Sequence, residues 1–172
     1  MKRIDVDELY SLYNGVRDRA VRWEGLQVYR VPWEKERIEA WERGETAPAD
    51  DRKDRSTRSM RRISESGRRS IRVRGLRRPA TDYIRRQFAT AYPNNAAAGE
   101  DTVVVDLDEH PEFDGVEDFV VFDRKSVMWY RYDDECRLLG YDFSDDAADV
   151  ADRVALLDRM LVAAVPYTEV VL

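Results

Sequence analysis

The strongest chemical signal in the sequence is a run of arginines. Residues 67–86, GRRSIRVRGLRRPATDYIRR, contain eight of them. Guanidinium groups bind phosphates and carboxylates through charge-assisted hydrogen bonds, so a face of this kind can hold a nucleic acid, an acidic ligand or an acidic protein. The residues that we consider for such a partner- or anion-binding face are Arg69, Arg72, Arg74, Arg77, Arg78, Arg85 and Arg86.

The same arginines have a second interpretation, which is pairing within the chain. The net charge is −6, but residues 51–90 carry +10 and residues 91–172 carry −14. Arginine suits fork-like pairing with carboxylates, and within the stretch only Tyr83 offers an aromatic ring on which a base could stack. We therefore expect most of these arginines to neutralise the protein's own carboxylates and part of the face to stay free for a partner.

A helix and the loop after it supply the second group of candidates. Thr81 is placed to cap a helix, and Gly99 can adopt a left-handed backbone in a turn. One interpretation of the polar residues between them is a small-ligand or peptide groove, whose candidates are Tyr83, Tyr92, Asn94 and Asn95. The other interpretation is structural, and we favour it because such residues are enriched in caps and turns.

Several familiar chemistries are excluded by what the sequence lacks. It has one histidine, His110, and one cysteine, Cys136, which excludes the usual structural zinc sets, and without a GxSxG motif there is no case for a catalytic triad. No GxxxxGK[ST] or GxGxxG phosphate cradle is present. The acidic loop 106–114 has Pro111 where an EF-hand requires glycine. We expect no metal and no cofactor, and we favour a protein that is not an enzyme.

Apolar residues at helical spacing, together with recognisable end signals, predict about four to five helices. Pro79 is expected to open the fourth of them and Pro93 to end it, and residues 94–101 are expected to form a loop. The predicted helices are one that begins at an Asp5–Glu8 capping box, 34–43, 51–66 with Gly67 as its stop, 79–92, and one from a cap at Ser144 or Asp145 to Val165.

Short segments rich in β-branched and aromatic residues predict strands. The short connections between the last three predict an antiparallel meander at the C-terminal end. Helices bracket a mostly antiparallel sheet and no βαβ alternation is apparent, so the predicted fold class is α+β, and we expect a single domain over residues 1–172. The predicted strands are 20–31, as one strand or a tight pair, 70–75, 102–107, 118–122, 126–132 and 136–143.

Four segments give the chain a family resemblance. They are RPATDYIRRQFATAYPNNAAAGED (78–101), WEGLQVYRVPWE (23–34), DFVVFDRKSV (118–127) and YDDECRLLGYDF (132–143). Together they resemble an actinobacterial family of unknown function over nearly the whole chain, although Val120 replaces an aromatic residue of that family. The resemblance implies no catalytic activity. Members are often encoded near helix-turn-helix transcription regulators, which implies a regulatory or signalling accessory role.

These observations lead to one functional prediction and one alternative. The sequence has no apolar run long enough to span a membrane and no leader-like apolar segment at its start, so we expect a cytoplasmic protein that does not bind membranes. We predict a non-enzymatic accessory protein that binds a protein partner, for example a helix-turn-helix regulator or a second copy in a homodimer. An exposed tryptophan, Trp33 or Trp41, would suit such an interface. The alternative is nucleic-acid binding through residues 52–86.

Overall fold

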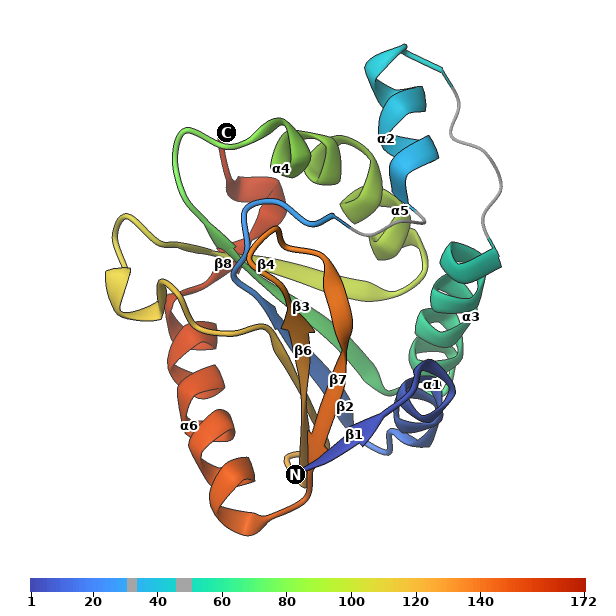
Figure 1. Cartoon of the computed structure of the whole chain (residues 1–172), viewed down its shortest axis with the longest axis vertical. Helices are drawn as coiled ribbons and strands as arrows, with labels where there is room; N and C mark the ends of the chain where they lie inside the picture. The colour runs from blue at the N-terminus through green and yellow to red at the C-terminus, as the bar shows by residue number, and fades with distance from the viewer. Residues whose placement is uncertain (31–33, 46–50) are drawn as a thin grey trace.

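A computed structural model describes residues 1–30, 34–45 and 51–172 (Figure 1). Its centre is an eight-stranded sheet in the order β1-β7-β6-β5-β2-β3-β4-β8. The strands are β1 (Lys2–Ile4), β2 (Arg19–Glu24), β3 (Arg69–Leu76), β4 (Glu100–Asp106), β5 (Phe119–Phe122), β6 (Ser126–Tyr132), β7 (Leu138–Ser144) and β8 (Val165–Pro166).

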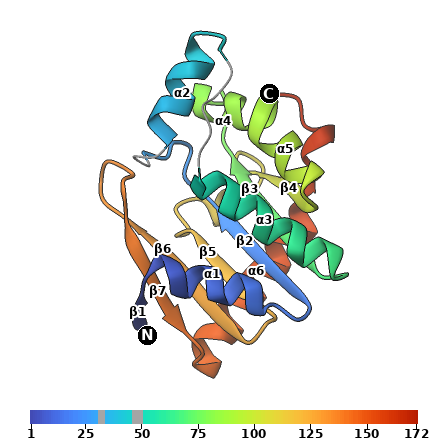
Figure 2. The same ribbon diagram turned by 90° about the vertical axis from the view of Figure 1, so that its right-hand side faces the viewer.

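Helices cover both faces of this sheet. Helix α6 lies on one face, whereas α1, α3 and the α4–α5 region lie on the other (Figure 2). The helices are α1 (Val6–Gly15), α2 (Lys35–Glu42), α3 (Asp51–Glu65), α4 (Asp82–Arg86), a π-helical turn (Gln87–Ala91), α5 (Tyr92–Ala97) and α6 (Ala147–Ala163), with short 3-10 turns at Pro111–Phe113 and Tyr167–Glu169.

The two faces of the sheet differ in polarity. Trp23 of β2 and Val73 of β3 are fully buried in the apolar core that the sheet forms with α6. Successive side chains of a strand point to opposite faces, so Arg22 and Arg72, next to them in sequence, point toward α1 and α3. A second apolar cluster, around Leu9 of α1, covers the far end of that face. The middle of the face is left with charged side chains.

The α+β class and the antiparallel meander β5-β6-β7 are confirmed. The prediction that the chain lacks βαβ units is wrong, because β2 pairs with β3 and β3 with β4 in parallel. Parallel neighbours need a crossover connection, which α3 provides before β3 and the α4–α5 region before β4. The βαβ pattern could not be recognised in the sequence, because α3 has few large apolar side chains and so does not resemble a helix that packs on a sheet.

The start of the predicted 79–92 helix is wrong. Pro79 lies before the helix, and α4 begins at Asp82 with Thr81 as its cap. The Thr81 hydroxyl accepts the backbone N–H of Ile84 at 3.2 Å and donates to the carbonyl of Gln27 at 2.7 Å. Thr81 therefore starts the helix because its side chain satisfies a free N–H, as the sequence suggested for this residue.

Pro93 does not end this helix, and residues 94–97 are not a loop. The backbone N–H of Tyr92 donates to the carbonyl of Gln87, five residues back, and α5 continues to Ala97. A proline in an ordinary α-turn lacks the N–H and clashes with the carbonyl four residues earlier. The wider π turn before Pro93 relieves that conflict. Asn94 is therefore helical rather than left-handed.

The remaining helix ends follow the predicted chemistry except at the two ends of α6. The Asp5–Glu8 capping box is formed, and Gly67, with φ of 74°, ends α3. The cap of α6 is Asp146, not Ser144 or Asp145, because its side chain accepts the first free N–H groups of the helix. Helix α6 stops at Ala163, so the predicted continuation of its buried face to Val165 is wrong as well.

Some predicted features fall beyond the part of the chain that the structure describes. Strand β2 ends at Glu24 and Arg30 forms an isolated bridge with Arg137, so the segment 20–31 is not one continuous strand. Val31 and Trp33 lie outside the described residues, whereas Trp41 is 41% exposed on α2. Among the helices of the described ranges, none combines the length and the apolar character needed to cross a membrane.

Candidate functional site

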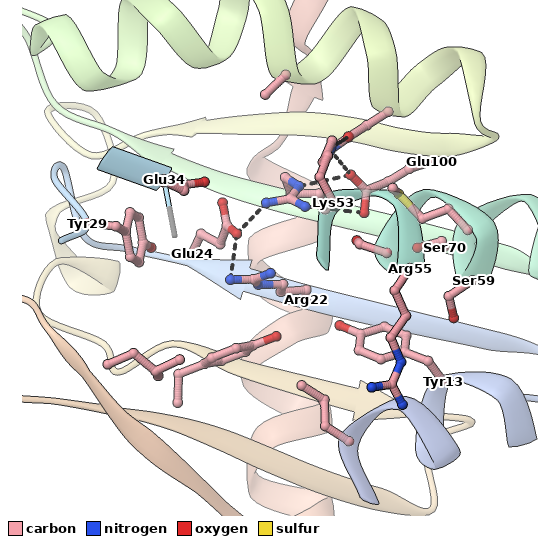
Figure 3. Close-up of a pocket in the computed structure, with 18 of the residues that line it drawn as sticks. Tyr13, Arg22, Glu24, Tyr29, Glu34, Lys53, Arg55, Ser59, Ser70 and Glu100 are labelled. Carbon is pink, nitrogen blue, oxygen red and sulfur yellow. Dashed lines mark hydrogen bonds and ion pairs between the residues drawn. The ribbon is translucent and has the colours of Figure 1, made fainter. Parts of the chain in front are cut away.

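A pocket of about 360 Å³ lies between the polar face of the sheet and helices α1 and α3 (Figure 3). Its walls come from α1, β2, α3, β3, the α4–α5 region and the β6–β7 hairpin. The apolar cluster around Leu9 reaches one side of the pocket, but most of the lining consists of charged side chains, phenol rings and serines. This combination of shape and polar lining is typical of a site for a small polar molecule.

The floor of the pocket is a network of charges centred on Glu24. One oxygen of Glu24 accepts a hydrogen bond from Arg72 and lies 2.8 Å from Nη2 of Arg22. The other lies 3.3 Å from Nη2 of Arg74, at ion-pair distance but without hydrogen-bond alignment. Arg72 also donates from Nε to Glu100 at 2.9 Å. Three neighbouring strands thus bring their charges together, and the pairing offsets the cost of burial.

Glu24 stays ionised in this network. Burial alone would raise its pKa, but the positive charges of Arg22, Arg72 and Arg74 overcome that effect and hold the pKa well below its usual range. A carboxylate held in this way is an anchor for arginines rather than a proton acceptor. The network therefore gives the pocket a rigid, ionised floor.

Phenol rings form much of the remaining wall. The hydroxyl of Tyr29 donates to Asp118 at 2.5 Å, and that of Tyr83 donates to Glu34 at 2.9 Å. Burial, reinforced by these carboxylates, raises the pKa of both phenols, so they stay protonated. The guanidinium of Arg22 lies 4.2 Å from the ring centre of Tyr130. The tyrosines that line the pocket are Tyr10, Tyr13, Tyr29, Tyr83, Tyr130, Tyr132 and Tyr141.

The upper wall of the pocket carries cations from the helices. Lys53 of α3 donates to the side-chain oxygen of Asn95 at 2.5 Å, and the Asn95 amide donates to Glu100 at 2.8 Å. Figure 3 shows Lys53 beside Glu100. Arg55, also on α3, pairs with Asp7 at 2.8 Å. The helix thus joins the charge network of the sheet through its inner face.

The structure separates the candidate arginines of residues 67–86 into a buried group and an exposed group. Arg74 is fully buried in the network, and the Arg72 side chain, 12% exposed, lies in it at the floor of the pocket. Arg74 also donates to Tyr92 at 2.9 Å and to the carbonyl of Leu26 at 2.7 Å. Arg86 is buried too, at 3.6 Å from Glu34. These three guanidinium groups point into the protein and pair with its internal carboxylates and polar groups.

The exposed group pairs with surface carboxylates. Arg69 lies 3.0 Å from Asp101, and Arg77 and Arg78 pair with Asp114 and Asp106. Arg85 is exposed, and no ion pair of it occurs within the described residues. The acidic partners of the stretch lie in both halves of the chain, since Glu24 and Glu34 join those of the C-terminal half. One continuous basic face is therefore not formed by these arginines.

The four groove candidates do not all lie at one site. Tyr83 and Asn95 line the pocket, whereas Tyr92 is fully buried against Arg74. Asn94 is exposed on α5. Neighbours in sequence point apart here because successive residues of a helix lie about 100° from one another.

The sequence analysis missed Arg22, Glu24 and Lys53. A signal for the first two was present in AVRWEG (20–25), where charged residues alternate with Val21 and Trp23 and so share one face of a strand. The signal for Lys53 was weaker, because Met60 and Ile63 are the only large apolar side chains of α3 that mark its inner face, and Lys53 lies on that face two turns before Met60.

Comparisons with known proteins identify the family and leave the activity open. No curated protein sequence gives a significant match. Among solved structures, the chain is similar to TrmBL2, an archaeal chromatin protein described as showing a novel mode of DNA binding, with a TM-score of 0.53 and 8% identity. The alignment covers 92% of this chain and 48% of TrmBL2, so the chain spans about half the length of that protein, and the likeness shows the fold alone. A family defined as a domain of unknown function, DUF6879, matches residues 7–171, and the chain therefore belongs to that family.

Proposed function

We propose that the chain is a non-enzymatic ligand-binding domain that takes a small polar molecule into the pocket between the sheet and α3. The observation that carries this proposal is the pocket itself, which has charged and phenolic walls fixed by hydrogen bonds from several elements. Preorganised polar groups in a concave site are the usual basis of small-molecule recognition.

The chemistry of the walls supports binding rather than catalysis. A general base needs a pKa near the working pH, and the arginines around Glu24 hold its pKa far below that range. The buried phenols of Tyr29 and Tyr83 have raised pKa values and act as hydrogen-bond donors. Glu24 and these two phenols thus provide fixed partners for a ligand and are held in one protonation state.

Filling the pocket should abolish ligand binding. Ser56 lines the pocket from α3, and we expect Ser56→Phe to remove the thermal stabilisation that a bound metabolite gives the wild type, because the ring occupies the ligand's space. The measurement is differential scanning fluorimetry against a panel of polar metabolites, followed by calorimetry. Thr57→Phe, at the next position of α3 but outside the lining, is the matched control and should bind like the wild type. Equal binding by both variants would argue against the pocket.

The regulatory role suggested by the family resemblance fits a ligand-binding domain. A domain that senses a small molecule would act through a protein partner, such as a helix-turn-helix regulator, or through a second copy. The most exposed large apolar side chains of the described residues lie on α6, in the C-terminal tail, before β1 and on β7, and they are Val162, Val171, Met1 and Leu139. They do not share one element, so the partner proposal rests on the resemblance.

A second candidate function, nucleic-acid binding, rests on the outer face of α3. Arg58, Arg61 and Arg62 are exposed at helical spacing, and within the described residues they take part in no ion pair. The structural neighbour TrmBL2 is a DNA-binding protein, which agrees with this candidate. The contacts would come from α3 and not from Arg72 and Arg74, because those two are buried.

This candidate predicts a salt-dependent complex with duplex DNA. The slope of log affinity against log salt should fall by about 3 when Arg58, Arg61 and Arg62 are all replaced by alanine, since each phosphate contact contributes close to 1. Fluorescence anisotropy with a short duplex measures it. Arg124→Ala removes an exposed arginine that pairs with Asp158 and should leave the slope unchanged. A wild type that does not bind at low salt would rule this candidate out.

A further inference from the structure

Lys53 is a cation inside the pocket whose ammonium group hydrogen-bonds to a neutral amide. Its ammonium group donates to the neutral oxygen of Asn95, and within the described part of the chain no carboxylate lies within ion-pair distance of it. An ammonium group has three donors, so the side chain retains hydrogen-bonding capacity toward the pocket. Lysine carries a strongly hydrated charge, and holding it half-buried without a counter-ion is unfavourable.

The groups around Lys53 increase this excess of positive charge. Burial lowers the pKa of Lys53, and the positive charges of Arg72 and Arg37 lower it further, against the opposing effect of Glu100 and Glu34. Arg37 of α2 also lines the pocket. Cations from α2, α3 and β3 therefore converge on one side of the pocket, where they repel one another.

The nearby carboxylates are already occupied by other partners. Glu100 accepts hydrogen bonds from Arg72 and from Asn95. Glu34 accepts from the hydroxyl of Tyr83 and lies 3.6 Å from Arg86. Within the described ranges, the acids around the pocket thus neutralise its floor and leave Lys53 without an ion-pair partner.

We propose that the ligand is a small organic oxyanion, a phosphate or carboxylate carried on a ring, with its anionic head at Lys53 and Arg37. This inference rests on the proposed function of the pocket and names the class of molecule that it takes. Oxyanions accept charge-assisted hydrogen bonds from ammonium and guanidinium groups. The ring would lie against the phenols of Tyr29 and Tyr83, since aromatic walls favour flat apolar bodies. A pocket of about 360 Å³ has room for such a body in addition to the head.

The test is isothermal titration calorimetry with phenyl phosphate, phenylacetate and neutral phenol. We expect the wild type to bind at least one of the two anions more tightly than phenol, and the stronger anion identifies the head group. Lys53→Gln should weaken that anion by about tenfold or more, which is the size of a lost charge-assisted hydrogen bond. Lys53→Arg should retain the binding. Lys35→Gln, on the exposed face of α2, is the matched control and should change nothing.

Measuring the affinity for the anion over a series of pH values distinguishes a ligand-binding role of Lys53 from a purely structural one. Affinity for the anion should fall as the pH rises through the pKa of Lys53 and should stay level in Lys53→Arg, which remains charged. Two results would overturn the inference. One is that neither anion binds, and the other is that phenol binds as tightly as the anions and Lys53→Gln has no effect. If a neutral metabolite still binds the wild type but not Ser56→Phe, the proposed function of the pocket stands and only the ligand class is wrong.

Discussion

Replacing Glu24 by glutamine should lower the free energy of unfolding by about 3–5 kcal/mol, the usual cost of removing one partner from a buried ion pair. Glu24 is 2% exposed and serves Arg22, Arg72 and Arg74 at once. Glutamine keeps the shape of the side chain but leaves three guanidinium groups without their common anion. Urea unfolding at pH 7, followed by circular dichroism, measures the change.

An exposed ion pair of similar geometry provides the control. Arg124 and Asp158 form a two-point contact at 2.7 and 2.8 Å, and both side chains are about half exposed. Asp158→Asn should cost less than about 1 kcal/mol, because solvent screens the pair. A similar loss in Glu24→Gln and Asp158→Asn would contradict the central role of the buried network.

The same network sets part of the acid sensitivity of the protein. The folded-state pKa of Glu24 lies well below its usual value of 4.5, so the stability that it contributes is fully present above about pH 4.5. That contribution is lost as the pH falls below this value toward the folded-state pKa. Glu24→Gln should therefore show a shallower decline of stability in acid than the wild type.

Arg74→Met should destabilise the protein by about 3 kcal/mol or more, whereas Arg85→Met should have almost no effect. Arg74 is fully buried and its hydrogen bonds satisfy Tyr92, Gln87 and the carbonyl of Leu26. Methionine fills a similar volume but leaves these polar groups without their donor. Arg85 is exposed on α4 and has no ion pair within the described ranges.

Chemical denaturation of the two variants under one set of conditions makes this comparison direct. Both changes remove one arginine from residues 67–86 and lower the net charge equally, so a difference in stability reports burial and not charge. If the two variants lose stability equally, the arginines of this stretch act through their total charge. That result would contradict the internal role of Arg74.

Much of the local structure could be predicted from the amino-acid sequence alone. The capping box at Asp5, the stop at Gly67 and the meander of β5, β6 and β7 all follow from side-chain chemistry within a few residues, and the structure contains each of them. The α+β class follows from the same local patterns. The chain belongs to a family of unknown function, as the resemblance implied.

The position of the candidate site depends on the tertiary fold. Arg72 and Arg85 cannot be distinguished within the arginine-rich sequence 67–86. In the structure, Arg72 lies on the central strand β3 and points into the protein, whereas Arg85 is exposed on α4. The parallel pairing of β2, β3 and β4 brings Glu24, Arg72 and Glu100 together across long sequence separations. The charges and spacing of residues along the sequence do not reveal this proximity, because it depends on which strands become neighbours and which face of the sheet each helix covers.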